Sequence, residues 1–159
     1  MPDWLIAVAV AVLRQRRAVR APVWLFRARL GCLFAGRLVM IEHIGRVTGA
    51  RRYAVLEVID RPRLDTYLVV AGFGDRAQWL RNIRADHRVR VYRRSRAPAA
   101  ATARELGPAE ARAVLYRYAA RHRRSWALLG PVLQRTLSQA AEVTTPLPPV
   151  VAFDVRPGR

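Results

Sequence analysis

Residues 39–56 read as two β-strands joined by a short basic turn, and this pattern constrains the fold more than any other stretch of the chain. Val, Ile and Met dominate the first arm, while the second arm, 53–59, is rich in the β-branched and aromatic residues that favour strands. Gly45 and Gly49 stand between the arms, and glycine permits backbone conformations that other residues resist. The stretch therefore predicts an antiparallel hairpin.

The turn of this hairpin carries an unusual concentration of positive charge. Arg46, Arg51 and Arg52 lie within a few residues of one another, together with the hydroxyl of Thr48. Guanidinium groups and outward-facing backbone N–H groups bind phosphate and carboxylate well, so the turn predicts an anion site. In a chain so rich in arginine, a solvated basic loop is the alternative, and the turn alone leaves both interpretations open.

A second informative segment follows the apolar residues 66–71, which predict a central strand. That strand ends at Gly72-Phe73-Gly74, and glycine at a strand end permits close approach of another backbone or a flat ring. We expect Asp75 to cap a helix over about residues 76–85. Trp79 and Asn82, three residues apart, would then share one face of that helix.

Further elements are expected on either side of these motifs. They are a helix over 4–13, a second helix over 23–35 after Pro22, a turn at 60–65, strands at 88–93, 99–106 and 150–155, and helices at 109–122 and 125–141. By periodicity alone the chain is a mixed α+β protein with antiparallel strands.

The two motifs in this order resemble the deazaflavin-dependent nitroreductase family, small reductases, also called quinone reductases, that use coenzyme F-420. The matching residues are Gly45-Arg46-x-x-Gly49-x-x-Arg52 followed by the glycine-containing strand end and Trp79-x-x-Asn82. The resemblance extends over about residues 39–155. It implies an α+β fold, a six-stranded antiparallel split β-barrel of the FMN-binding type, with N-terminal helices and flanking C-terminal helices.

The resemblance also implies a cofactor site. A deazaflavin transfers two electrons as a hydride from a ring carbon, so the protein must hold donor and acceptor in line rather than supply a nucleophile or metal. The hairpin would hold the phosphate and carboxylates of the coenzyme through Gly45, Arg46, Thr48, Gly49, Arg51 and Arg52. The ring would be lined by Val55, Ala71, Gly72, Gly74, Gln78, Trp79 and Asn82. No catalytic residue is assigned, and Trp79 as a core anchor and Asn82 as a helix cap stay open.

The implied activity is hydride transfer from reduced coenzyme F-420 to a small organic acceptor of the quinone or nitro class. One alternative is a non-catalytic split-barrel protein that binds flavin or deazaflavin, with FMN as the alternative cofactor.

A second alternative, a basic nucleic-acid-binding protein, follows from the net charge of the chain. There are 29 basic residues, all arginine, against 11 acidic residues, a net charge of +18. Such an excess favours acidic ligands, anionic membranes or nucleic acid. Aromatic residues are only 8% and do not interleave with the arginines, which argues against single-strand binding.

Residues 1–36 are predicted to form an amphipathic, Arg-rich helical segment, separate from a deazaflavin-binding domain at 37–159. Such a segment can lie at the surface of an anionic membrane or pack on the barrel. Its apolar run, 4–13, is too short to span a membrane, and its positive charges follow the run rather than precede it as in a secretory signal. We therefore expect a cytoplasmic protein, with a peripheral position on the inner face of the cell membrane left open.

Cysteine and histidine add little to this interpretation. Cys32 is the single cysteine, so there is no internal disulfide, and the histidines show no ligand spacing, so no metal site is expected. A homodimer is implied by the resemblance to other split barrels.

Overall fold

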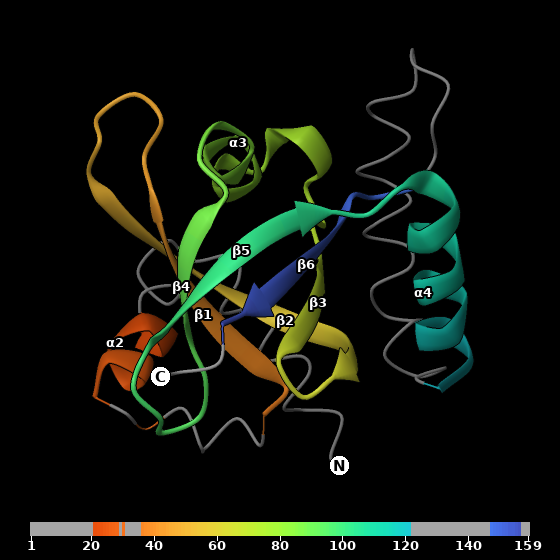
Figure 1. The fold of residues 1–159 in the computed structure, drawn as a ribbon, viewed down its shortest axis with the longest axis horizontal. Helices are drawn as coiled ribbons and strands as arrows, with labels where there is room; N and C mark the ends of the chain where they lie inside the picture. Colours follow the sequence, from red (N-terminus) through yellow and green to blue (C-terminus); the bar gives the residue numbers. More distant parts are fainter. Residues whose placement is uncertain (1–20, 29, 31–35, 122–146, 157–159) are drawn as a thin grey trace.

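The computed structural model describes residues 21–28, 30, 36–121 and 147–156, and in this part of the chain the strands form one closed antiparallel barrel. Around the barrel the strands follow the order β1-β2-β3-β6-β5-β4 (Figure 1). Their bounds are β1 Leu38–Ile44, β2 Arg51–Arg63, β3 Thr66–Val70, β4 Arg88–Tyr92, β5 Ala99–Glu105 and β6 Val150–Val155. The predicted six-stranded α+β split barrel is thus confirmed.

Helices lie at the ends and on one side of this barrel (Figure 1). The described helices are α2 Ala21–Arg27, the 3-10 turn η3 Gly74–Arg76, α3 Gln78–Ala85 and α4 Pro108–Arg121. Pro108 occupies the first position of α4, where its missing N–H costs nothing. Because α3 follows β3 directly, it lies close to the β1–β2 hairpin at one end of the barrel.

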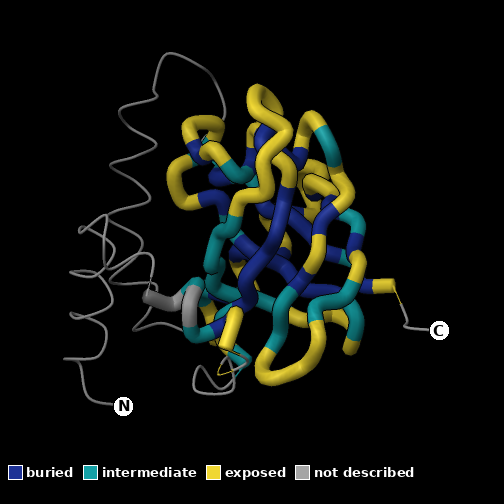
Figure 2. The backbone as a smooth tube through the Cα atoms, turned by 90° about the vertical axis from the view of Figure 1, so that its left-hand side faces the viewer, coloured by how far each residue is buried: buried dark blue, intermediate teal, exposed yellow. Residues whose placement is uncertain are grey.

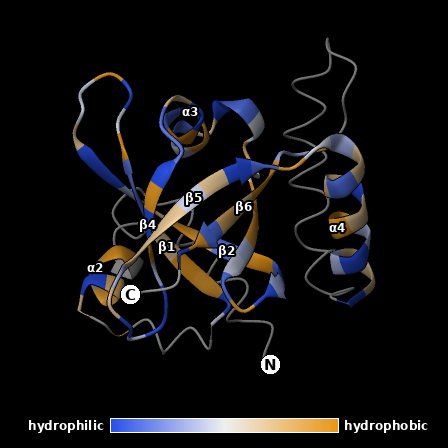
Figure 3. Ribbon diagram, viewed as in Figure 1, coloured by the Kyte–Doolittle hydropathy of each residue, from blue (hydrophilic) through white to orange (hydrophobic). Residues whose placement is uncertain are grey.

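The barrel interior is filled by alternate residues of the strands. Buried residues lie along the strands in Figure 2, and the strands carry many hydrophobic residues in Figure 3. Val39, Ile41, Val69 and Phe153 are fully or almost fully buried there. A second apolar cluster joins the outer face of the sheet to α4, and it includes Leu68, Val114, Leu115, Val150 and Ala152. Consecutive residues of β3 and β6 are therefore buried on opposite faces, which explains the unbroken apolar sequence of β3.

Strand β2 is longer than the sequence predicts. Residues 60–63, expected in a turn, continue the strand to Arg63, which pairs with Thr66 of β3. The register shifts between Val58 and Asp60 and again before Arg63. Such irregularities let a strand continue while its charged side chains face solvent. The polar residues 60–63 therefore still pair with β3.

Two helix starts also differ from expectation. Ala77, not Asp75, is the N-cap residue of α3 and makes no side-chain capping bond, because η3 intervenes and places Asp75 one turn earlier. In place of the predicted helix 23–35, the described helix is Ala21–Arg27, so it includes Pro22 and ends at Arg27.

Several expectations fall on other parts of the chain. The predicted helices at 4–13 and 125–141 lie outside the described residues, and so does most of the 1–36 segment, so its separation from 37–159 stays a prediction. Among the described residues, none of the helices has the length and apolar character needed to cross a membrane.

Candidate cofactor-binding site

The β1–β2 hairpin ends in a compact, hydrogen-bonded turn. The N–H of Gly45 donates to Ala50 O at 2.8 Å, and the N–H of Gly49 donates to Gly45 O at 2.8 Å. Gly49 has a φ of 65°, the left-handed region that favours glycine. A Cβ on Gly45 would lie 3.1 Å from both Arg52 Nε and Thr48 Oγ1. Glycine at position 45 therefore lets the Arg52 side chain lie against the turn.

The three arginines of the hairpin do not all gather at one point. Arg46 turns toward α3, where its Nη1 donates to Gln78 Oε1 and to Asn82 Oδ1, each at 3.0 Å. Arg51 turns to Glu42, with Nη1 at 3.6 Å from Oε1. Successive strand residues face opposite sides of a sheet, so Arg51 and Arg52 diverge. Arg46 and Arg52 thus share one side, and Arg51 lies on the other.

Asn82 is the buried link between the hairpin and α3, with 3% of its surface exposed. Its Oδ1 accepts hydrogen bonds from the Arg46 backbone N–H at 3.2 Å and from Arg46 Nη1. Because arginine and the backbone N–H can only donate, the amide oxygen must face Arg46. The amide nitrogen therefore faces His43, and Nδ2 lies 3.2 Å from His43 Nδ1.

This arrangement determines the protonation state and tautomer of His43, which is also 3% exposed. Burial lowers the pKa of His43 below its ordinary value, the nearby positive charge of Arg52 lowers it further, and a backbone hydrogen bond at Ile44 partly opposes the shift. The ring is therefore neutral near pH 7. Since Nδ1 accepts from Asn82, the ring proton lies on Nε2.

A cleft made of two neighbouring cavities lies between the hairpin turn and α3. It consists of a smaller cavity of about 220 Å³ at the turn and a larger one of about 410 Å³ beside it, with Arg52, Gln78 and Asn82 lining both. The remaining residues of the smaller cavity are Gly45, Arg46, Val47 and Thr48. Those of the larger cavity are His43, Tyr53, Ala54, Phe73, Arg76, Ala77 and Trp79. One end of the cleft is therefore cationic, and the other is walled mainly by aromatic and apolar groups.

Trp79 belongs to both the cleft and the core. Its ring is tilted at 47° to that of Phe153, with centroids 6.4 Å apart, and it also lines the larger cavity. The two interpretations of Trp79 left open by the sequence are thus compatible. Asn82 does not act as a side-chain cap, since its amide bridges the hairpin and His43.

Besides Arg51, five residues of the predicted set line neither cavity of the cleft: Gly49, Val55, Ala71, Gly72 and Gly74. Ala71 is fully buried in the core, and Val55 lies on the opposite face of β2 from Ala54. Gly72 is exposed and Gly74 is partly buried in the segment between β3 and α3, and a Cβ on either would meet no atom within 4 Å. Whether they contact a cofactor remains a prediction.

Several cleft residues were not anticipated from the sequence: His43, Tyr53, Ala54, Phe73, Arg76 and Ala77. Strand alternation was an available signal for Ala54, because it lies two residues from Arg52 and so on the same face. His43 was detectable as a polar residue inside an otherwise apolar strand. The positions of Phe73 and Arg76 depend on how η3 folds back over the barrel end, for which the sequence has no local signal.

The closed barrel and the cleft at its end define the class, a small split-barrel protein with a ligand-sized cleft between a hairpin and a short helix. The chain belongs to the F420H(2)-dependent quinone reductase family, whose model matches residues 15–137. It is therefore a member of a family of F420-dependent oxidoreductases, and the predicted resemblance is confirmed.

Solved structures share the fold of this chain. An F420-H2 dependent reductase, FDR-A, matches with 25% identity and a TM-score of 0.51, covering 74% of this chain and 94% of that one. A structure described as a domain-swapped dimer matches at 23% identity and a TM-score of 0.51, covering 82% and 97%. A putative pyridoxamine 5'-phosphate oxidase from Listeria innocua shares the fold at 8% identity and a TM-score of 0.51, covering 84% and 94%. The search of curated proteins found no match.

Proposed function

We propose that the protein transfers a hydride from reduced coenzyme F-420 to a small organic acceptor of the quinone or nitro class. The observation that carries this proposal is that a cationic cavity and a mainly aromatic and apolar cavity adjoin, with Arg52, Gln78 and Asn82 lining both. The coenzyme has a phosphodiester and an oligoglutamate tail at one end and a flat ring at the other. The two parts of the cleft fit these two chemistries.

At the cationic end, Arg46 and Arg52 would hold the phosphate, with the hydroxyl of Thr48 assisting. The partners of Arg46 on α3 are neutral amides, so the guanidinium keeps its full charge while its direction is set. Both of those bonds use Nη1, and a guanidinium has five N–H donors, so donors remain for an anion. Arg51 contributes less directly, because it faces Glu42.

At the aromatic end, Trp79, Phe73 and Ala54 would provide surfaces for the ring, and Gly72 and Gly74 leave the space above the strand end clear of side chains. The bound coenzyme supplies the hydride. The task of the chain is to hold donor and acceptor in contact and to limit access of water. This explains why the activity needs no nucleophile in the cleft.

Binding and turnover measurements with purified full-length protein test the proposal. Coenzyme F-420 affinity is measured by fluorescence titration for the wild type, Arg46→Gln, Arg52→Gln and, as a matched control, Arg112→Gln, an exposed arginine on α4. A hydrogen bond to a charged group contributes about 1.5–3 kcal/mol, so each hairpin variant should weaken binding by roughly tenfold or more. Unchanged affinity in both would contradict the assignment of the phosphate site.

Turnover separates the remaining possibilities. Oxidation of the reduced coenzyme is followed with menadione and with a nitroimidazole as acceptors, and parallel binding assays use FMN and duplex DNA. Coenzyme binding without oxidation by any acceptor would favour a non-catalytic binder. Retention of DNA alone, weakened steeply by salt, would favour the nucleic-acid alternative.

Homodimer formation and contact with an anionic membrane remain predictions about the whole chain. Sedimentation equilibrium tests the first. Co-sedimentation with anionic vesicles, with and without residues 1–36, tests the second.

A further inference from the structure

A second cavity, of about 300 Å³, lies at the end of the barrel away from the cofactor cleft. We call it the distal cavity; it is lined by Gly36, Leu38, Val39, Arg61, Leu64, Tyr67, Arg93, Arg94 and Arg96. Leu38 begins β1, whereas the hairpin follows Ile44 at its other end, so the two sites are separated by roughly 20 Å of strand. Figure 1 shows the β4–β5 and β2–β3 connections at the lower edge of the barrel and the β1–β2 hairpin at the upper edge.

The guanidinium groups of the four arginines of the distal cavity have no carboxylate partner among the described residues. Every carboxylate in the described segments lies within 4.0 Å of an arginine other than these four. The described carboxylates thus form ion pairs with other arginines. The positive charge of the distal cavity is therefore not balanced by a carboxylate from the described part of the protein. Clustered like charges around a concave surface focus a positive potential and attract anions.

Two of these arginines, Arg61 and Arg94, are exposed but make contacts that orient them at the rim of the distal cavity. The Arg61 guanidinium stacks over the Tyr67 ring, 4.6 Å from its centroid, and its Nη2 donates to Leu64 O. Arg94 has a φ of 47°, in the left-handed region, and its Nε would lie 3.2 Å from a Cβ on Gly36. The glycine therefore leaves room for this guanidinium against the backbone.

Arg93 carries a buried donor that nothing in the described structure satisfies. Its Nε is shielded from solvent and has no hydrogen-bond acceptor among the described residues. A buried donor without an acceptor is costly, and an anion in the adjacent cavity is the natural group to satisfy it. The strained backbone at the neighbouring Arg94 is consistent with a binding site, since such strain gathers where ligands are held.

We propose that the distal cavity binds a phosphate-bearing ligand. Arginine recognises phosphate through paired, charge-assisted hydrogen bonds, and four arginines suit a doubly charged phosphate better than a single carboxylate. The cavity is larger than a phosphate group, and Leu38, Leu64 and Tyr67 provide an apolar wall, so the ligand carries an organic group beside the phosphate. A free phosphoester and the headgroup of an anionic phospholipid share this chemistry. The proposal does not depend on the function assigned to the cofactor cleft.

Calorimetric titration with inorganic pyrophosphate tests the site. The calorimetry variants are made in an Arg46→Gln/Arg52→Gln background, which removes the competing cations of the cofactor cleft. In that background pyrophosphate should bind at one site, and adding Arg93→Gln/Arg96→Gln should weaken it at least tenfold. Adding Arg90→Gln/Arg112→Gln, which removes two exposed arginines elsewhere, should change affinity less than twofold. Equal affinity in the two quadruple variants would overturn the proposal.

A further variant separates binding from folding. Arg94→Gly removes one guanidinium and also relieves the left-handed backbone, so its melting temperature without ligand should be unchanged or higher. Its pyrophosphate affinity should nevertheless fall.

Vesicles distinguish the two sources of phosphate. Wild-type protein and the Arg93→Gln/Arg96→Gln variant are sedimented with phosphatidylcholine vesicles with and without phosphatidylglycerol. Loss of vesicle binding in the variant assigns the site to a lipid headgroup, whereas loss of pyrophosphate binding alone assigns it to a free phosphoester. Loss of neither overturns the proposal.

Coenzyme F-420 binding by the Arg93→Gln/Arg96→Gln variant should match the wild type. Failure of coenzyme binding in both proteins would count against the cofactor cleft only.

Discussion

Asn82 shows how one buried amide can set the direction of a cationic group. Its oxygen accepts two hydrogen bonds from Arg46, and its nitrogen lies at 3.2 Å from the ring of His43. The side chain thus connects the hairpin turn, β1 and α3 at one point. Removing it would leave donors on Arg46 and the ring nitrogen of His43 without these partners.

We therefore expect Asn82→Ala to lower the free energy of unfolding by about 1–3 kcal/mol, the cost of leaving buried polar groups unpaired. Urea denaturation measures the change. Gln78→Ala is the matched control, because Gln78 accepts from the same guanidinium but is exposed, and it should lower stability by less than about 0.5 kcal/mol. Equal losses in the two variants would contradict the bridging role of Asn82.

His43 predicts a specific dependence of stability on pH. Burial holds its pKa below 6.5 in the folded protein. Below pH 6.5 the unfolded chain takes up a proton at this residue before the folded one does, so stability should fall as pH decreases from 6.5 toward the folded pKa. Well above pH 6.5 both states are neutral at this residue, and it should add no slope there.

Urea midpoints between pH 5 and 8 for the wild type and His43→Gln measure this effect. The difference between their slopes isolates His43 from the other titrating groups. Parallel curves below pH 6.5 would show that His43 is protonated equally in both states.

At the scale of elements, two of the motif glycines with open surroundings, Gly49 and Gly72, should behave differently. Gly49 has a positive φ, so Gly49→Ala should destabilise the protein by roughly 1–2 kcal/mol through backbone strain. Gly72 is not in that region, and a Cβ there would meet no atom within 4 Å, so Gly72→Ala should leave stability within about 0.5 kcal/mol of the wild type.

Gly72→Ala then provides a clean test of where the coenzyme ring lies. If the ring rests over the strand end, the added methyl should weaken F-420 binding while thermal unfolding stays unchanged. Wild-type affinity in this variant would place the ring elsewhere in the cleft.

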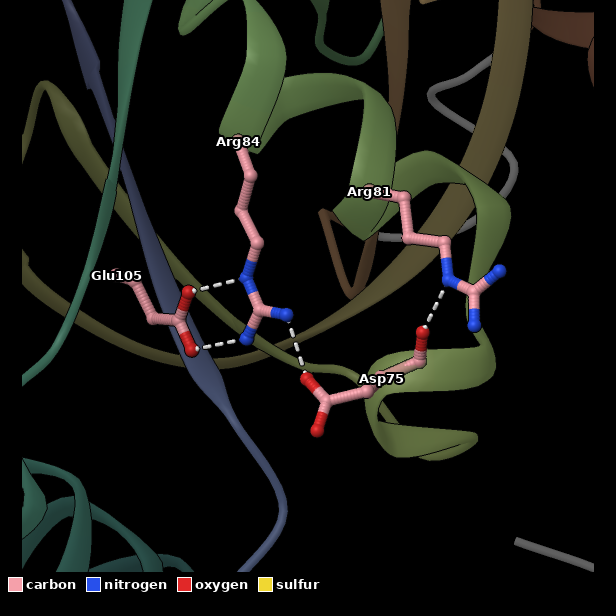
Figure 4. Close-up of polar contacts among 4 residues, drawn as sticks. All are labelled: Asp75, Arg81, Arg84 and Glu105. Carbon is pink, nitrogen blue, oxygen red and sulfur yellow. Dashed lines mark hydrogen bonds and ion pairs between the residues drawn. The ribbon is translucent and has the colours of Figure 1, made fainter.

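The η3–α3 segment is tied to the barrel by a polar network (Figure 4). Arg84 donates through Nε and Nη2 to the carboxylate of Glu105 at 2.8 and 2.7 Å, and through Nη1 to Asp75. These bonds, led by the one to Glu105, raise the pKa of Arg84 above its ordinary value, so it remains charged. Arg81 Nε also donates to Asp75 O at 2.7 Å. The network links the segment that carries Phe73 and Arg76 to the end of β5.

We expect Arg84→Gln to speed amide hydrogen exchange in residues 73–77, because it removes the attachment of this segment to β5. Global stability should change by less than about 1 kcal/mol, since the ion pairs are partly exposed. Exchange at the wild-type rate in 73–77 would show that packing alone holds the segment.

For the molecule as a whole, the net charge of +18 means that many arginines have no acidic residue to pair with. The described carboxylates are each paired with arginine. Some of the arginines without such a pair line the cofactor cleft and the distal cavity. An acidic coenzyme should therefore bind with a marked salt dependence.

We predict that F-420 affinity falls steadily as sodium chloride is raised toward about 1 M, where charges are screened beyond about 3 Å. Fluorescence titrations at several salt concentrations measure the slope, which should be shallower for Arg52→Gln and unchanged for Arg112→Gln. An affinity independent of salt would show that ring stacking, not charge, dominates binding.

Local sequence determined much of this protein: the hairpin, the strand at 150–155, the helix that carries Trp79 and Asn82, and the ordered motifs that identify the family. Those features depend on side-chain pattern and on glycine and proline positions, which act over a few residues. Only the tertiary structure decided that Phe73 and Arg76 line the cleft, that Arg51 turns to Glu42, and that Asn82 bridges two elements. These outcomes depend on strand face and on partners distant in sequence, because the energy of a polar contact is set by what the fold brings beside it.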